Sequence, residues 1–254
     1  NNAAVSGDAQ TVLTAKNKAD GSISFGTLKY TEAGTYVYEA KETSESGNGI
    51  SVDTSIFTVT VEVEDNGLGQ LVIKSQTVKK NGASADLKFE NTYKTGEAEA
   101  EVKATKTLTG RGLKAEEFEF SLTPVSAVAE DGTAIEDTNT ARTVKNTEGG
   151  AVVFGGLKYT KTGTYTYEMK ETSAGGNGVT VDSRVYTVTV TVVDNGDGTL
   201  TASPAYSIDK KEAAPEFINT YKAEPVETTV SGTKTLTGQT LKEDQFDFEL
   251  RLVE

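Results

Sequence analysis

Residues 179–193, VTVDSRVYTVTVTVV, decide the fold class. They are mostly β-branched and aromatic, they alternate with a period of two, and turn residues flank them at 177–178 and 194–196. This pattern is typical of β-strands, and Asn-Gly between alternating runs is a strong hairpin signal. No stretch shows a sustained helical period, although residues 113–117 could form one helical turn. Short strands between frequent turn signals predict an all-β protein built from immunoglobulin-like β-sandwiches.

The same stretch belongs to an internal repeat. Residues 34–71 match residues 163–200 without a gap, at an offset of 163 − 34 = 129. FENTYK at position 89 matches FINTYK at position 217, an offset of 217 − 89 = 128. KTLTG at Lys106 recurs at Lys234, again at an offset of 234 − 106 = 128. A repeat of this length indicates tandem modules.

The repeat predicts how the chain divides. Residues 101–222 hold one complete β-sandwich module, and residues 1–94 hold a module that lacks its first strands. Residues 226–254 hold only the first strands of a further module, so they can complete a unit like 1–94 from another chain. One module is therefore complete, and another is split between the chain termini. Residues 95–101 and 223–227 are predicted to be short linkers.

The composition excludes several kinds of function. The 254 residues include no cysteine, histidine or tryptophan, which rules out thiol nucleophiles, disulfides, Cys/His zinc sites and a Ser-His-Asp triad. The formal charge of −13 disfavours nucleic acid and anionic lipid as partners, and apolar runs are too short for membrane insertion. Residues 194–198 superficially resemble a calcium loop but lack the distal glutamate, so we expect an acidic hairpin turn, no metal and no cofactor.

Three polar residues fall on faces that alternation predicts to be buried. Glu171 shares a face with Tyr165, Tyr167 and Met169; the same counting turns Lys106 and Asn219 toward the core. Burying a lone charge is unfavourable by several kcal/mol unless it is paired or neutralised. The residues alone leave two structural interpretations open. One is a buried Lys–Glu ion pair capped by the Asn, and the other is three edge positions whose side chains reach solvent.

The motifs around these residues resemble the FctA-like streptococcal pilin isopeptide-domain family, the immunoglobulin-like modules of Gram-positive pilins and adhesins. They are KTLTG before an EFEF-type strand, Y-x-Y-x-x-x-E in mid-domain and F-x-N-T-Y at the end, and together they span almost the whole chain. In that family a first-strand Lys forms an amide with a last-strand Asn, promoted by a buried Glu. The resemblance implies a Lys106–Asn219 bond with Glu171 as proton shuttle. In the split unit, the resemblance implies a bond between Asn91 and Lys234, with Glu42 as proton shuttle.

The chemistry suits buried groups. Desolvation favours the neutral forms of both an amine and a carboxylic acid. The neutral amine can attack the Asn side-chain carbonyl, which we expect the acid to polarise by a hydrogen bond, and ammonia leaves. The reaction happens once, so the resemblance implies autocatalytic self-processing and no enzyme in the ordinary sense.

The sequence therefore predicts a structural stalk module of a bacterial surface adhesin or pilus, extracellular and part of a cell-wall-anchored parent protein. The expected partners are neighbouring modules or copies of the chain, head-to-tail, because the split pieces each leave an open sheet edge. The alternative is a ligand-binding module that recognises a glycan or host protein through its loops. Near-identity of the two units favours the stalk, since repeated spacers need only length and strength.

Overall fold

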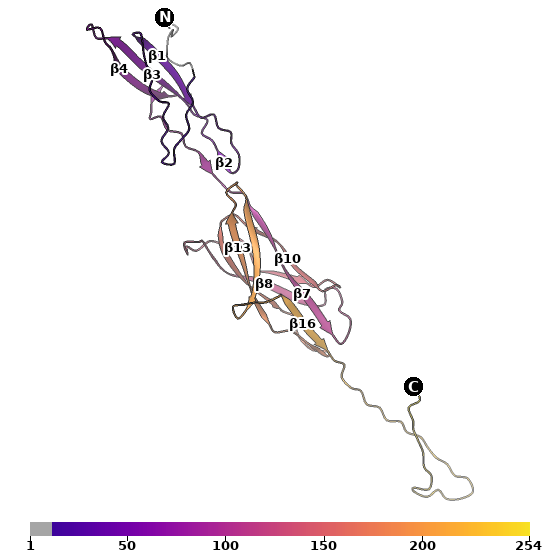
Figure 1. The fold of residues 1–254 in the computed structure, drawn as a ribbon. Helices are drawn as coiled ribbons and strands as arrows, with labels where there is room; N and C mark the ends of the chain where they lie inside the picture. The colour runs from indigo at the N-terminus through magenta and orange to yellow at the C-terminus, as the bar shows by residue number, and fades with distance from the viewer. Residues whose placement is uncertain (1–11) are drawn as a thin grey trace.

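The computed structural model describes residues 12–254, and over this range it contains sixteen strands and no helix. An N-terminal unit, a complete unit and an extended C-terminal tail follow one another along the chain (Figure 1). No helix that could cross a membrane is found among these residues. The predicted all-β class is confirmed.

The complete unit is a sandwich of two sheets. A four-stranded sheet has the order β10-β7-β16-β12, and a six-stranded sheet has the order β15-β14-β13-β11-β8-β9. Neighbouring strands are antiparallel except β16 and β7, which are parallel. The strands are β7 (Ala98–Thr109), β8 (Glu119–Val128), β9 (Arg142–Lys145), β10 (Ala151–Tyr159), β11 (Gly163–Glu171), β12 (Val179–Thr180), β13 (Val185–Asp194), β14 (Leu200–Ile208), β15 (Lys211–Glu212) and β16 (Glu216–Tyr221).

The core of this sandwich follows the period of two. Every second residue of β11 and β13 is buried between the sheets, which is why the alternating stretch predicted a half-buried strand. Phe217 of β16 packs against Phe120 and Tyr186 of the facing sheet, with ring centroids 5.1 and 5.2 Å apart. The apolar faces of both sheets thus form one continuous core.

The N-terminal unit repeats only part of this architecture. It has one four-stranded sheet, β1-β3-β4-β5, and the separate pair β2-β6. Residues 22–30 and 13–16 match β10 and β9 by sequence but form no strand. The reason is that β10 pairs with β7 and β9 pairs with β8, and residues 12–94 include a counterpart of neither partner strand. Its strands are β1 (Gly34–Lys41), β2 (Ile50–Ser51), β3 (Ile56–Asp65), β4 (Leu71–Lys80), β5 (Ala83–Ser84) and β6 (Thr92–Tyr93).

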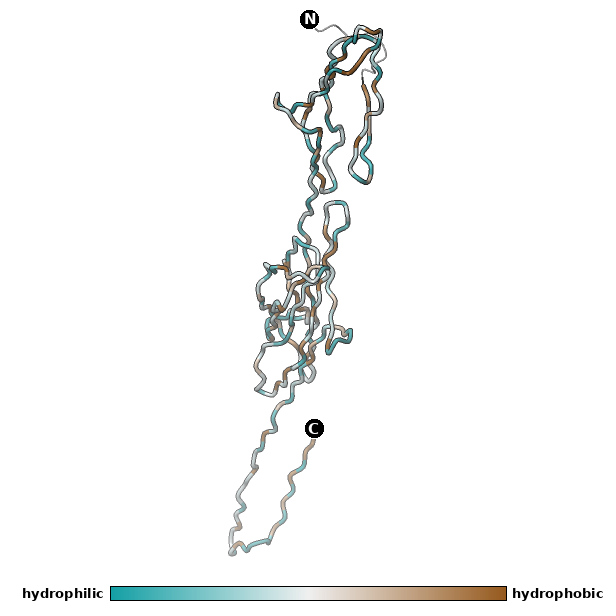
Figure 2. The backbone as a smooth tube through the Cα atoms, turned by 90° about the vertical axis from the view of Figure 1, so that its left-hand side faces the viewer, coloured by the Kyte–Doolittle hydropathy of each residue, from teal (hydrophilic) through white to brown (hydrophobic). Residues whose placement is uncertain are grey.

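The tail carries the sequence of the missing strands but forms none. Phe248 and Leu250 are 76% and 82% exposed, whereas their counterparts Phe120 and Leu122 are 0% and 1% exposed. Figure 2 shows this tail standing apart from the folded units, with hydrophobic and hydrophilic positions alternating along it. The tail therefore exposes to solvent apolar residues whose counterparts form the core of the complete unit.

Two local expectations were wrong. Residues 113–117 form no helical turn; they contain a tight turn at 115–116 with Glu116 at φ 58°. Residues 95–101 are not all linker, because β7 already begins at Ala98. Ala98 and Ala100 point into the core opposite Tyr159 and Leu157 of β10. Because alanine is small and only weakly apolar, this part of the strand shows no clear alternation of apolar and polar residues in the sequence.

Candidate functional site

The two parallel strands β7 and β16 bring Lys106 and Asn219 together. Lys106 lies level with Phe217, and Asn219 lies two residues further along, level with Leu108. Both residues point into the sandwich, and they are 2% and 0% exposed. The long lysine side chain can therefore span the diagonal between the two positions.

Glu171 reaches the same point from the opposite sheet, where it is the last residue of β11. Its Oε2 atom lies 2.8 Å from Nζ of Lys106, and both side chains are fully buried. Its Oε1 atom accepts a hydrogen bond of 2.7 Å from Nδ2 of Asn219. One carboxylate thus contacts the amine on one oxygen and the side-chain amide on the other.

The orientation of Asn219 is fixed by a backbone group. The N–H of Asp182 donates a hydrogen bond of 2.7 Å to Oδ1 of Asn219. An amide N–H can only donate, so Oδ1 must face Asp182 and Nδ2 must face Glu171. This differs from the expected contact of the acid with the Asn carbonyl: Glu171 contacts the leaving-group nitrogen, and Asp182 contacts the carbonyl oxygen.

Burial governs the electrostatics of Lys106. Desolvation lowers the pKa of its amine, and the hydrogen bond and charge of Glu171 oppose that shift without cancelling it. The Nζ atom also lies 4.6 Å from the ring centroid of Phe118 and 5.9 Å from that of Phe120. A lowered pKa makes the neutral, nucleophilic amine easier to form.

The arrangement can carry out an amide exchange. Oε2 of Glu171 can accept a proton from Nζ, which frees the lone pair to attack Cγ of Asn219. Negative charge then develops on Oδ1, where the Asp182 N–H already donates, as an oxyanion-hole donor does. Oε1 of Glu171 lies against Nδ2 and can return a proton there, so that ammonia leaves.

The N-terminal unit repeats this site without the lysine. Nδ2 of Asn91 donates to Oε1 of Glu42 at 2.9 Å, and the N–H of Asp53 donates to Oδ1 of Asn91 at 2.8 Å. Lys234 is not brought to them; it lies exposed in the tail, beyond the complete unit (Figure 1). Five of the six predicted site residues are thus brought to their expected partners: Lys106, Glu171 and Asn219 in the complete site, and Glu42 with Asn91 in a half-site that has no lysine.

Sequence reasoning missed the two aspartates. The Asp182 carboxylate accepts from the N–H of Ile218 at 2.7 Å and pairs with Arg184, which ties this loop to β16. Asp53 makes the matching contact with the N–H of Glu90 at 2.9 Å. The available signal was a charged residue repeated at the same place in two otherwise alternating runs, SVDTS and TVDSR.

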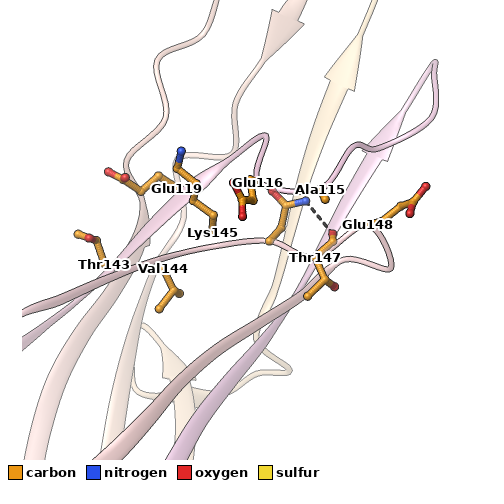
Figure 3. Close-up of a pocket in the computed structure, with 9 residues that line it drawn as sticks. Ala115, Glu116, Glu119, Thr143, Val144, Lys145, Thr147 and Glu148 are labelled. Atoms are coloured by element: carbon orange, nitrogen blue, oxygen red, sulfur yellow. Dashed lines mark hydrogen bonds between the residues drawn. The ribbon is translucent and has the colours of Figure 1, made fainter.

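A separate hollow of about 640 Å³ is lined by Ala115, Glu116, Glu119 and residues 143–148 (Figure 3). Its rim carries the carboxylates Glu116, Glu119 and Glu148. The buried Asn146 also lines the hollow and holds the 113–118 turn: it accepts from the N–H of Phe118 and donates to the carbonyl of Lys114, both at 2.8 Å. None of the three reacting residues lines this hollow, so it contributes no group to the chemistry above.

Comparison with known families assigns the chain. Residues 1–94 and 102–222 match FctA, described as the Spy0128-like isopeptide containing domain. The chain belongs to this family, which confirms the resemblance. No curated protein matches this chain.

Solved structures with some likeness are major pilins of Streptococcus pyogenes. The T3.2 pilin is 22% identical, with 77% of this chain and 69% of that chain covered and a TM-score of 0.26. The T-13 pilin is 20% identical, with 82% and 76% covered and a TM-score of 0.26. A further major pilin is 18% identical, with 78% and 73% covered and a TM-score of 0.29. These scores are too low to support any argument, so the assignment depends on the family match alone.

Proposed function

We propose that the complete unit is closed by an amide bond between Nζ of Lys106 and Cγ of Asn219. The observation that carries the proposal is the buried Glu171 carboxylate, which contacts Nζ at 2.8 Å and Nδ2 at 2.7 Å. The amine and the carboxamide give a secondary amide and one ammonia; the lysine's remaining proton goes to Glu171 or to the ammonia. Glu171 acts once per molecule, so the reaction is self-processing and the protein is not an enzyme.

The proposed function is that of a shaft module. Lys106 lies in the first strand of the unit and Asn219 in the last, 219 − 106 = 113 residues apart. Tension that enters at β7 and leaves at β16 passes through the bond, so the intervening chain cannot be pulled out. A protein without cysteine thereby obtains a cross-link that reductants do not open. Membership of the isopeptide-domain family supports placing it on a bacterial surface, in a pilus or adhesin whose parent protein is anchored to the cell wall.

We further propose that the tail of one chain completes the N-terminal unit of the next. The tail already has local features of β7 and of the turn that leads from β7 to β8. Nζ of Lys234 lies 4.8 Å from the ring centroid of Phe246, much as Lys106 lies 4.6 Å from Phe118. The backbone N–H of Lys242 is held by Gln245 at 3.0 Å, as that of Lys114 is by Glu117.

The N-terminal unit has the matching acceptor features. Asn91 and Glu42 form the half-site described above, which needs only a lysine amine. Asn17, the counterpart of Asn146, already donates to the carbonyl of the next residue, Lys18, as Asn146 does to Thr147. The complete unit stands between the tail and this half-site in the same chain (Figure 1), so Lys234 cannot reach its own half-site, and we propose that a second copy of the chain supplies the lysine. A Lys234–Asn91 amide, with Glu42 as proton shuttle, would then link chains covalently.

Accurate mass of the denatured protein tests the first bond. Each bond releases ammonia, so the chain is expected to weigh about 17 Da less than its sequence predicts, because the amine displaces the carboxamide nitrogen. Peptide mapping should show Lys106 joined to Asn219. An unshifted mass with Lys106 free in the map would overturn the proposal.

The carbonyl contact gives a second test. Asp182→Ala removes the ties to Ile218 and Arg184 that hold the 182 N–H against Asn219. We expect bond formation in freshly synthesised, unreacted chain to slow by about tenfold or more, because the donor that faces the developing oxyanion is no longer fixed. The mass is followed with time. Asp131→Ala, which removes a similar contact to Thr133 in an exposed turn, should leave the rate unchanged. Equal rates for the two variants would show that the loop does not assist the reaction.

A further inference from the structure

The N-terminal and complete units meet in a specific polar contact. The hydroxyl of Tyr93 donates to Oδ1 of Asp194 at 2.7 Å and accepts from the N–H of Gly198 at 3.1 Å. The N–H of Gly96 donates to the carbonyl of Gly198 at 2.8 Å. The 194–198 turn, which resembled a calcium loop in the sequence, thus receives the end of the preceding module.

This contact requires glycine on both sides. A Cβ atom on Gly49 would lie 2.7 Å from the Cα of Gly198, and one on Gly198 would lie 2.4 Å from the nitrogen of Gly49. Both residues also have positive φ angles, of 79° and 83°. The two backbones therefore approach more closely than any side chain would permit, and the Tyr93 hydroxyl fixes them in that position.

The repeat contains both halves of this contact a second time, one in the complete unit and the other in the N-terminal unit. Tyr221 and Gly178 are the counterparts of Tyr93 and Gly49, and the N–H of Lys222 donates to Gly178 at 2.9 Å as that of Lys94 does to Gly49. At the other end, Asp65 and the 65–69 turn correspond to Asp194 and the 194–198 turn. In each turn the Asp carboxylate accepts from the N–H two residues later at 2.8 Å.

Within residues 12–254, these two halves do not contact each other. Across residues 12–254, the Tyr221 hydroxyl makes no hydrogen bond, and the Asp65 carboxylate makes only the one to Gly67. The spacing to the reacting lysine is also the same at both junctions. Tyr93 precedes Lys106 by 106 − 93 = 13 residues, and Tyr221 precedes Lys234 by 234 − 221 = 13. A tail inserted into the next chain's N-terminal unit therefore has the linker length that brings Tyr221 to the 65–69 turn.

We propose that Tyr221 and Gly178 of one chain dock on the 65–69 turn of the next, with the Tyr221 hydroxyl donating to the Asp65 carboxylate. The occupant of this surface is a second copy of the chain. That choice depends on the strand complementation proposed above, whereas the docking contact itself repeats the Tyr93–Asp194 junction. Docking holds the tail in place before the covalent bond forms. It also fixes the orientation of each chain relative to the next.

Two full-length variants isolate one intermolecular step. Lys234→Ala removes the donor lysine, and Asn91→Ala removes the acceptor amide, so an equal mixture can form only one covalent dimer. Tyr221→Phe, introduced into the Asn91→Ala chain, is expected to slow dimer formation roughly tenfold, the effect of losing a hydrogen bond to a charged group. Asp65→Asn in the other chain should slow it similarly. The two changes together should cost little more than one, because they remove the same contact.

The controls separate this inference from the covalent bond. Tyr93→Phe in the Asn91→Ala chain alters only the internal junction and should leave the dimerisation rate unchanged. Dimers that form as fast with Tyr221→Phe as without it overturn the docking but not the bond. If no dimer forms, reversible association of the Lys234→Ala chain is measured by sedimentation velocity. Association that Tyr221→Phe weakens upholds the docking without the bond, whereas association that is insensitive to it, or absent, overturns the docking.

Discussion

Glu171→Ala is expected to leave the denatured chain at the full mass of its own sequence, whereas the wild-type chain should weigh about 17 Da less than its sequence mass because the complete unit has lost ammonia. The carboxylate is the one group that contacts both Nζ of Lys106 and Nδ2 of Asn219 in the described structure, so its loss removes both proton transfers. The remaining amine stays protonated or, if neutral, cannot expel the amide nitrogen. The measurement is intact mass, followed over days.

Glu168→Ala is the matched control. Glu168 lies on the same strand but faces solvent, where it pairs with Lys170. Its replacement should leave the mass loss intact. If Glu171→Ala still forms the bond at the wild-type rate, Glu171 is not the proton shuttle and another acid must be sought.

Stability should fall as well, and a second variant shows how much of the fall is due to the bond. Closing a loop of 113 residues is worth about 4–5 kcal/mol by analogy with disulfides, or roughly 10–20 °C in Tm. Glu171→Ala additionally leaves Lys106 buried without its ion-pair partner, which costs about 3–5 kcal/mol more. Asn219→Ala keeps that ion pair and loses the bond, so it should melt at a temperature between those of the wild type and Glu171→Ala.

The sequence predicted which residues meet but not how their atoms face. Strand alternation is a local property, so counting by two was enough to turn Lys106, Glu171 and Asn219 inward. The orientation of the Asn219 amide depends on the N–H of Asp182, in a loop 219 − 182 = 37 residues away that no periodicity describes. The expectation that the acid polarises the carbonyl failed for that reason.

The module junction was equally beyond local patterns. The residues of the 194–198 turn indicated a hairpin, but their role at the junction depends on Tyr93, which lies 101 residues away in sequence. The repeat, by contrast, predicts which strands residues 1–94 lack, because the complete copy shows what should precede them. What the sequence could not show is that residues 22–30, although present, remain unpaired when their partner strand is missing.

A boiled denaturing gel of the concentrated protein is expected to show a ladder of covalent oligomers. The N-terminal unit holds Asn91 against Glu42 at 2.9 Å, and the tail offers Lys234 in an extended segment whose apolar residues are exposed. Insertion would bury side chains such as Phe248 and Leu250, each worth about 1.5–3 kcal/mol when fully removed from water. A head-to-tail contact of this kind joins unlike surfaces, so it continues from chain to chain unless the rotation closes a ring.

Lys234→Ala should abolish the ladder, because it removes the amine that reacts. Lys242→Ala is the control and should preserve the ladder. Lys242 matches Lys114, which lies in a turn and is not one of the three reacting residues of the complete unit. Asn91→Ala should abolish the ladder equally from the acceptor side. Mixing the Lys234→Ala and Asn91→Ala chains should restore a single dimer band and nothing larger, since each product has used its only competent donor and acceptor. A lone monomer band for the wild type, with residues 1–94 readily proteolysed, would show that the half-site stays empty. Cross-linking that survives Lys234→Ala would assign the linkage to another lysine.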